Sequence, residues 1–327
     1  MPRKARLDAP GALHHIMVRG IDKTDIFVDH QDKTRFLECL GENVTEGKCS
    51  VYAWVLMDNH VHLLFKSGKY GISAVMRKLL TWYAQYFNRR HKRVGHLFQN
   101  RYKSILCDEE NYLLALIRYI HLNPVRANIV QTIEELDRYP TAGHSAIIGK
   151  AKHPWMDVDT VLSQFSDKKK KAIAEYRRFV LEEFRSGHNA ELTGGGLIRS
   201  QGGWSQVLAM QRSGKKEEFD ERILGTGDFV HAIMGEVEDR QLRQTKLRKR
   251  GKGIDEIIRE ECDKRGINEG ELKRGSRRQK VSQARAVIAL RCKEEIGCPG
   301  AEIARHLGVT TTSINRAVER AEGLLSE

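Results

Sequence analysis

One apolar stretch in the first quarter of the chain constrains its fold more than any other feature. Val51–Met57 is an unbroken apolar run, Asp58-Asn59 is a polar turn pair, and His60–Phe65 is a second run that is mostly apolar. Two such runs joined by a short polar turn predict an antiparallel β-hairpin. Because side chains alternate across a strand, His60 and His62 are expected on the same face of the second strand.

This pair of histidines has two interpretations. Histidines on a half-buried strand are commonly satisfied by hydrogen bonds inside the fold and need no ligand. Two neutral imidazoles on one face can also hold a divalent cation. The pair alone favours the first interpretation, so other residues must decide between them.

Elements on both sides of the hairpin indicate the fold class. Leu13–Val18 has the pattern of a strand, and Asp29–Val44 and Ser73–Arg90 carry apolar residues at helical spacing. A third helix is expected from about residue 108 until Asn123-Pro124, where proline should stop or kink it. The resulting order β-α-β-β-α-β-α is typical of an α+β sandwich: an antiparallel sheet with helices on one face and the other face open for chemistry.

Length and charge limit the classes of function. The chain has 327 residues and a formal net charge of +13, which suits two or three domains and a polyanionic partner such as nucleic acid. No apolar run is long enough to span a membrane, and the N-terminus lacks a secretory signal, so a cytoplasmic, nucleoid-associated protein is expected. The six cysteines form no C-x-x-C pair, which predicts reduced thiols and no structural zinc site.

Basic residues cluster at two places in the N-terminal half. The helix that ends at Arg90 finishes in a basic run, and Phe98–Lys103 interleaves cations with aromatic side chains. A basic helix end is often just solvated, but this combination favours phosphate contact with base stacking. The candidate DNA contacts in this half are Arg19, Arg89, Arg90, Arg101 and Lys103.

The end of the chain has the pattern of a helix-turn-helix. Helices are expected at Ser282–Glu295, Ala301–Leu307 and Thr311–Leu324, with a glycine turn at Gly308. A plain three-helix bundle is the alternative, but in a basic protein this spacing favours a last helix that enters the major groove of duplex DNA. The residues expected to face DNA are Thr311, Thr312, Ser313, Asn315 and Arg316.

Three parts are therefore predicted: an α+β domain at 1–145, a helical and basic connecting region at 146–270, and a helix-turn-helix domain at 271–327. Within the connecting region, Gly194–Gly196 indicates a flexible link. The basic block Gln241–Gly253 is either a linker or a phosphate-binding arm.

Tyr119 and Asn123 give the histidine pair a chemical meaning. They are four residues apart on a predicted helix and so share a face. Such a tyrosine usually has a structural role at the edge of a core. Beside His60 and His62, however, the amide oxygen of Asn123 could complete a site for a divalent cation, and Tyr119 could attack a phosphodiester. A phenol is mostly protonated at neutral pH, so the attack needs the cation or a base.

Three ordered motifs resemble those of the REP-associated tyrosine transposases, which are HUH single-strand DNA nucleases. The motifs are Trp54–Leu64, Leu97–Lys103 and Arg118–Ala127, within a resemblance that spans about residues 5–145. The resemblance implies that His60 and His62 bind the metal, that Tyr119 is the nucleophile and that Asn123 is the third ligand. It also implies Mg²⁺ or Mn²⁺, a ferredoxin-like core and hairpin DNA from palindromic repeats as substrate.

The sequence departs from this pattern at Asp58, where relatives often have proline. The departure affects the turn and lies outside the ligand set. The segment Ser276–Leu325 is similar to the DNA-binding domain of the bacterial replication initiator. Gly203-Trp204 and Asp220–Gly225 resemble segments of longer members of the transposase family.

The leading hypothesis is therefore a metal-dependent endonuclease and strand transferase that cleaves and rejoins single-stranded hairpin DNA through a phosphotyrosine. It would act as a monomer or homodimer, with its C-terminal domain on duplex DNA. A non-catalytic DNA-binding regulator is the alternative. An RNA-binding module explains the open sheet face but not the paired histidines.

Overall fold

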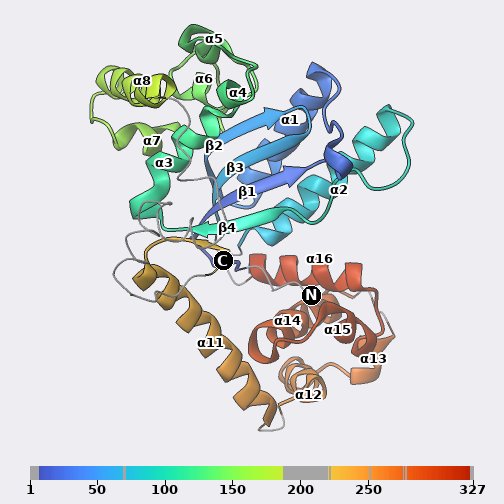
Figure 1. Cartoon of the computed structure of the whole chain (residues 1–327). Coiled ribbons are helices and arrows are strands. Elements are labelled where there is room, and N and C mark those ends of the chain that lie inside the picture. The colour runs from blue at the N-terminus through green and yellow to red at the C-terminus, as the bar shows by residue number, and fades with distance from the viewer. Residues whose placement is uncertain are drawn as a thin grey trace. The chain divides into compact units, whose positions relative to one another are not determined.

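The computed structural model of the chain describes residues 7–68, 71–186, 220, 222–249, 252–274, 276 and 278–324. It divides into two units, Met1–His231 and Ala232–Glu327, which we call unit 1 and unit 2 and describe separately (Figure 1). The predicted division into three parts at residues 145 and 270 stays a prediction. Within the described part of the chain, no helix has the length and apolar character needed to cross a membrane.

A five-stranded sheet with the order β2-β3-β1-β4-β5 forms the centre of unit 1. The first four strands are antiparallel neighbours, and β5 pairs with β4 in parallel. With one helix after β1 and one after β3, this is the β-α-β-β-α-β order of a ferredoxin-like core, as predicted. The elements are β1 Leu13–Arg19, η1 Ile21–Lys23, α1 His30–Glu46, β2 Ser50–Met57, β3 His60–Lys66, α2 Ser73–Arg90, β4 Lys103–Cys107 and β5 Ile223–Leu224.

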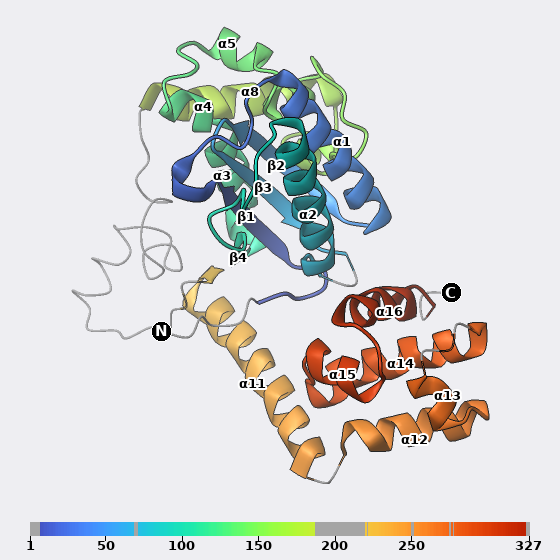
Figure 2. The ribbon, with the colours of Figure 1, turned by 90° about the vertical axis from the view of Figure 1, so that its right-hand side faces the viewer.

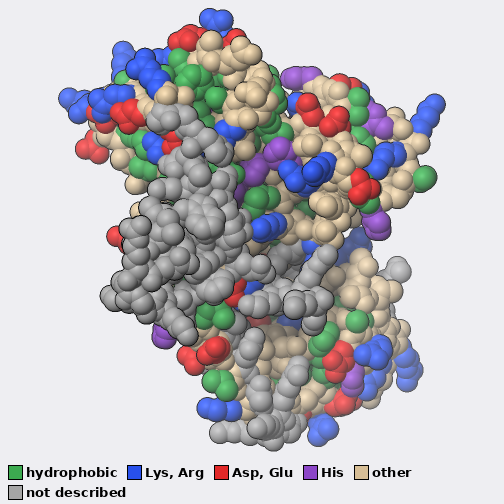
Figure 3. Space-filling view, viewed as in Figure 1, with side chains coloured by type: hydrophobic (Ala, Val, Ile, Leu, Met, Phe, Trp, Pro, Cys, Tyr) green, Lys and Arg blue, Asp and Glu red, His purple; other side chains and the backbone are tan. Residues whose placement is uncertain are grey.

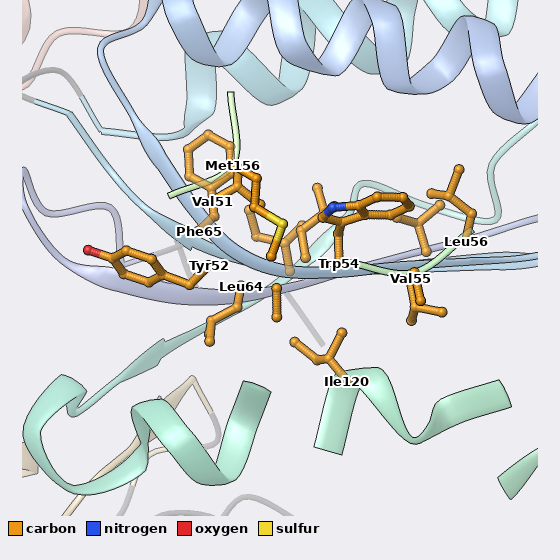
Figure 4. Packing of buried hydrophobic residues seen from close by; sticks show 14 of the residues in the cluster. Val51, Tyr52, Trp54, Val55, Leu56, Leu64, Phe65, Ile120 and Met156 are labelled. Atoms are coloured by element: carbon orange, nitrogen blue, oxygen red, sulfur yellow. The ribbon is translucent and has the colours of Figure 1, made fainter. Parts of the chain in front are cut away.

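Helices lie on both faces of this sheet. α1 and α2 cover one face, as predicted, whereas α3 (Glu109–His121) packs on the opposite face, which is therefore not fully open (Figure 2). Figure 4 shows the two layers: Phe65 points toward α1 and α2, and Leu64 points toward Ile120 of α3. His60 and His62 lie four and two residues before Leu64 on β3, so they share its face of the sheet and point toward α3.

Carboxylate side chains fix where the main helices of unit 1 begin. Asp29 caps α1 by accepting a hydrogen bond from the Asp32 backbone N–H, and Asp108 caps α3 in the same manner. Asp8, far away in sequence, accepts hydrogen bonds from the N–H groups at the start of α2. α3 ends at His121, and Pro124 starts the short helix α4 (Asn123–Arg126), which confirms the predicted stop.

The chain after α4 adds short helices that the sequence pattern does not indicate. The segment around residue 141 contacts β2: Leu56 donates a backbone hydrogen bond to the carbonyl of Thr141. A long helix, α8, follows these short ones. The helices are α5 Ile133–Arg138, α6 His144–Ile147, α7 Val158–Ser163 and α8 Lys169–Ser186. The predicted link at Gly194–Gly196 lies outside the described residues.

Unit 2 is helical and has its own apolar core, which includes Ile257, Ile288 and Ile314. The three predicted helices at the end of the chain are present. Most of the basic block Gln241–Gly253 is helical, because α11 continues to residue 249. The elements are α11 Gly227–Lys249, which begins in the last residues of unit 1, α12 Ile254–Arg265, α13 Glu269–Lys273, α14 Gln279–Ile296, α15 Gly300–His306 and α16 Thr311–Leu324.

Gly308 forms the turn between α15 and α16. Its φ of +61° is in the left-handed region, and a Cβ atom there would lie 2.2 Å from the carbonyl oxygen of Lys273. Both facts require glycine at this position.

Candidate active site

The site is built on the face of the sheet that α3 covers. His15 on β1 and His62 on β3 are nearly buried there, and the Nε2 atom of His15 lies 2.9 Å from the Nδ1 atom of His62. His60 is half-buried at the start of β3, and its ring centroid is 5.1 Å from that of His62. Three imidazoles therefore meet on one face.

Hydrogen bonds set the protonation pattern of the paired histidines. The Nδ1 atom of His60 lies 2.6 Å from the amide oxygen of Asn59. Since that oxygen can only accept, Nδ1 of His60 carries the proton and Nε2 keeps a lone pair. The Nδ1 atom of His62 is likewise within hydrogen-bond distance of His15. This contact leaves Nε2 of His62 for other partners. A histidine that ligates a metal through one nitrogen commonly uses the other in such a bond.

Electrostatics keep both imidazoles neutral at neutral pH. Burial, with a smaller effect of the Arg19 charge, lowers the pKa of His60 to about 4. Burial also lowers the pKa of His62 well below its ordinary value, and His15 adds to this effect. Neutral imidazole is the form that binds a metal ion, so the site needs no deprotonation step near pH 7.

α3 brings Tyr119 against these histidines. The Tyr119 ring centroid is 5.9 Å from that of His15 and 6.2 Å from that of His62, with near-perpendicular ring planes in both pairs. The structure therefore joins the two predicted halves of the site. This arrangement can present a phenol next to a cation held by the histidines.

Asn123 can offer a metal ion only one side-chain atom. Its side-chain nitrogen donates to the backbone carbonyls of Tyr119, at 2.9 Å, and of Ile120, at 3.2 Å. This orientation leaves Oδ1 as the atom that could act as a ligand. Among the described residues, no three His, Cys, Asp or Glu side chains are grouped as a metal site. A cation on the two histidines thus needs oxygen ligands, such as this amide or a phosphate, and the donor set fits a divalent ion.

His15 is a site residue that the sequence reasoning missed. It follows another histidine in an ordinary strand pattern, and nothing in the local sequence separates the two. The antiparallel pairing of β1 with β3 puts His15 on the site face, whereas His14 faces the other side and contacts Ser104. Cross-strand register is information that one strand alone does not carry.

Two of the candidate DNA contacts lie on the site face. Arg19 is directly opposite His60 in the β1–β3 register, and Lys103 is opposite Met17 in the β1–β4 register. Paired residues point to the same side of a sheet, so both cations accompany His15 and the histidine pair. Figure 3 shows histidine side chains at the surface of this region with Lys and Arg side chains beside them.

The other candidates of unit 1 are placed differently. Arg101 is exposed in the loop before β4, and Arg89 is exposed in the last turn of α2, the helix on the opposite face. Arg90 forms ion pairs with Asp29 and Asp32 at the start of α1. Two carboxylates inside the fold therefore already match the charge of Arg90.

In unit 2, the candidate DNA contacts occupy the first half of α16. Thr311, Thr312, Ser313 and Arg316 are exposed, and Asn315 is half-buried. Thr310 caps this helix, because its hydroxyl accepts from the Ser313 backbone N–H at 3.2 Å. The exposed side chains follow the cap and leave the apolar positions Ile314 and Val318 in the core.

Comparison with known proteins bears on this site. A comparison with curated protein sequences finds no match. Among solved structures, a REP-associated tyrosine transposase bound to a REP hairpin is similar at 16% identity and a TM-score of 0.39, covering 47% of this chain and 89% of that one.

The family model described as "Transposase IS200 like" matches residues 10–123. The matched segment contains β1 to β4, His60, His62 and Tyr119, and it ends at Asn123. The family resemblance predicted from the sequence motifs is thus confirmed. The domain of unit 1 that holds β1 to β4, at residues 10–123, is therefore similar to the IS200-like transposase family.

Proposed function

We propose that this domain is a metal-dependent single-strand DNA endonuclease and strand transferase that cleaves and rejoins hairpin DNA through a phosphotyrosine. The observation that carries the proposal is the packing of the Tyr119 ring against His15 and His62 on the face that also bears His60. His60 on that face reaches the surface, so a phosphodiester can approach the tyrosine and the histidines together.

In the proposed reaction, Tyr119 Oη forms a bond to the phosphorus atom of the scissile phosphodiester. The phosphorus–oxygen bond to the leaving strand breaks, the phenol proton is lost, and the leaving oxygen gains a proton to become a free hydroxyl. The phosphotyrosine keeps the phosphodiester energy, so a second hydroxyl can reverse the step and join strands without ATP.

His60 and His62 would hold a divalent cation, Mg²⁺ or Mn²⁺, through their Nε2 atoms, with Oδ1 of Asn123 as the third protein ligand. Such a cation, when bound, offsets negative charge that develops on the phosphate oxygens. His15 fixes the ring orientation of His62 through its 2.9 Å contact. Arg19 and Lys103, on the same face, would hold the DNA backbone by its phosphates.

For the C-terminal part, we propose that α15, the Gly308 turn and α16 form a helix-turn-helix that binds duplex DNA. The exposed hydroxyls of α16 together with Arg316 suit contacts in the major groove. Hairpin DNA and duplex DNA would then be held by different units of one chain, which acts at the nucleoid.

Incubation with labelled hairpin DNA tests the catalytic proposal. The wild-type protein with Mn²⁺ should give a covalent protein–DNA adduct on a denaturing gel, because the phosphotyrosine bond survives denaturation. Tyr119→Phe lacks the attacking oxygen and should give none, although it should still bind the hairpin.

Two results would reject this function. One is an adduct of undiminished yield with Tyr119→Phe. The other is hairpin binding by the wild-type protein with no adduct across a broad hairpin library, which would favour a non-catalytic DNA-binding regulator.

A further inference from the structure

Tyr119 is held by an arginine that the proposed reaction does not use. Arg126 is the last residue of α4, and its guanidinium carbon lies 4.6 Å from the centroid of the Tyr119 ring. Its Nη1 atom donates a 2.6 Å hydrogen bond to the backbone carbonyl of Tyr119. One planar side chain therefore contacts both the ring and the backbone of the same tyrosine.

A carboxylate on α8 fixes that arginine. Oε1 of Glu183 accepts a 2.8 Å hydrogen bond from Nη2 of Arg126, and Oε2 of Glu183 lies 2.6 Å from Nε of Arg118. Arg118 also stacks on the ring of Phe179, at 4.1 Å from its centroid. Glu183 thus links the residue before Tyr119 with the arginine that covers its ring.

Burial makes these contacts rigid. The side chain of Glu183 is 7% exposed, that of Arg126 is 16% exposed and that of Arg118 is 20% exposed. Charge-assisted hydrogen bonds strengthen when they are shielded from water, and the planar fork of arginine loses little freedom in making two at once. Without these contacts, the half-buried Tyr119 ring could rotate about its two side-chain torsions.

The position of Glu183 in the chain gives this arrangement its significance. The family match ends at residue 123, whereas Glu183 lies sixty residues later. The nucleophile is thus braced by a helix from outside the matched segment.

We propose that Arg126 is a positioning residue for Tyr119 and that Glu183 acts through Arg126 to orient the phenol for attack. This inference rests on the proposed function for its role in catalysis. The contact geometry itself can be tested without catalysis.

The first experiment measures the single-turnover rate of adduct formation at saturating hairpin DNA and Mn²⁺. Because a displaced nucleophile loses the attack geometry, Arg126→Gln should slow the rate by about ten- to a hundred-fold while the hairpin Kd stays within about twofold. Arg126→Lys keeps the charge but not the fork, so it should also be slow. A wild-type rate in both variants would overturn the proposal.

Glu183→Gln tests the contact between Glu183 and Arg126. It should slow the reaction less than Arg126→Gln, and the double variant should be no slower than Arg126→Gln alone, since Glu183 acts through Arg126. The matched control is Glu182→Gln on the same helix, which removes an exposed partner of Arg178 and should leave the rate unchanged. Additive losses in the double variant would contradict the coupling.

The second experiment reads the tyrosine directly. 3-Fluorotyrosine placed at position 119 should give a ¹⁹F resonance that shifts or broadens in Arg126→Gln and Glu183→Gln but not in Glu182→Gln. If the wild type forms no adduct but the resonance responds in this way, the positioning contact stands and the proposed function fails. If the resonance does not respond in folded variants, the positioning proposal is overturned whatever the activity.

Discussion

Two histidine clusters of unit 1 differ in a way that separates a candidate site from a structural network. The site cluster consists of His15, His60 and His62. The enclosed cluster consists of His121 on α3, His144 on α6 and Tyr176 on α8, together with Asp137 on α5. Burial lowers the pKa of His62 and of His121 well below the ordinary value, so a depressed pKa alone does not distinguish the clusters.

Hydrogen bonds inside the enclosed cluster form one continuous chain. Asp137 accepts from Nε2 of His144 at 3.0 Å, and its pKa is lowered: burial would raise it, but the hydrogen bonds from His144 and Lys150 outweigh that effect. With its proton on Nε2, His144 uses Nδ1 to accept from the Tyr176 hydroxyl at 2.9 Å. The hydroxyl in turn accepts from Nδ1 of His121 at 2.8 Å. Every other polar atom of these side chains that is named here has its partner within the cluster, whereas Nε2 of His121 is buried without one.

The two clusters differ in their access to the surface. His121, His144 and Tyr176 are 0% exposed, so no ligand reaches them. In the site cluster, His60 reaches the surface and its Nδ1 bond to Asn59 leaves Nε2 for a ligand. Burial tunes both clusters toward neutral imidazole, but only surface access turns such an imidazole into a ligand for an incoming cation.

The strongest test of this contrast replaces one histidine from each cluster. His62→Ala should remove Mn²⁺ binding and should lower adduct formation by about two orders of magnitude or more. Electron paramagnetic resonance of the free Mn²⁺ ion measures the binding. His144→Gln should keep both if the protein stays folded. Equal loss of Mn²⁺ binding in the two folded variants would erase the distinction.

A smaller effect, on the free energy of unfolding, is expected when tyrosine is replaced by phenylalanine in each cluster. Tyr176→Phe removes the hydroxyl that joins His121 to His144 and leaves buried nitrogens unpaired, which should lower the free energy of unfolding by about 1–3 kcal/mol. Tyr119→Phe should lower it by less than about 0.5 kcal/mol, because its ring packing is kept. Urea unfolding of both variants measures the difference, and the reverse order would mean that Tyr119 is the structural residue.

The sequence predicts much of this fold because its long elements have clear periodicity. The predicted limits of Ser73–Arg90 and Thr311–Leu324 agree with those of α2 and α16. The short helices α5, α6 and α7 have four to six residues, too few to show a helical period. The sequence does not predict that α3 packs on the second face of the sheet either, because an apolar helix face does not show which surface it will cover.

For the candidate site, the sequence supplies the chemistry but not the contacts. His60, His62 and Tyr119 are residue types whose spacing suggests a metal site and a nucleophile, and the structure brings His62 and Tyr119 together. His15 depends on cross-strand register. Arg90 forms an ion pair with Asp32, which lies far away in the chain. The sequence of the basic run does not show this pairing, so it predicts that Arg90 is available for DNA.

The last prediction concerns His14, a buried histidine that belongs to neither cluster and whose replacement should leave the site unaffected. Burial lowers its pKa to about 4, whereas an unfolded histidine has a pKa near 6.5. Between these values the unfolded state binds a proton that the folded state does not, so the free energy of unfolding falls as the pH drops from about 6.5 to about 4. One such group contributes a slope of about 1.4 kcal/mol per pH unit in that window and none above it.

His14→Gln should therefore reduce the difference in urea midpoint between pH 7.5 and pH 5.0. The amide can still bond to Ser104, now 3.1 Å from Nδ1 of His14, but it does not titrate. Adduct formation at pH 7.5 should not change, because His14 faces away from the site. An unchanged pH dependence would show that His14 is protonated inside the fold, and burial alone could then no longer explain why imidazoles in both clusters stay neutral.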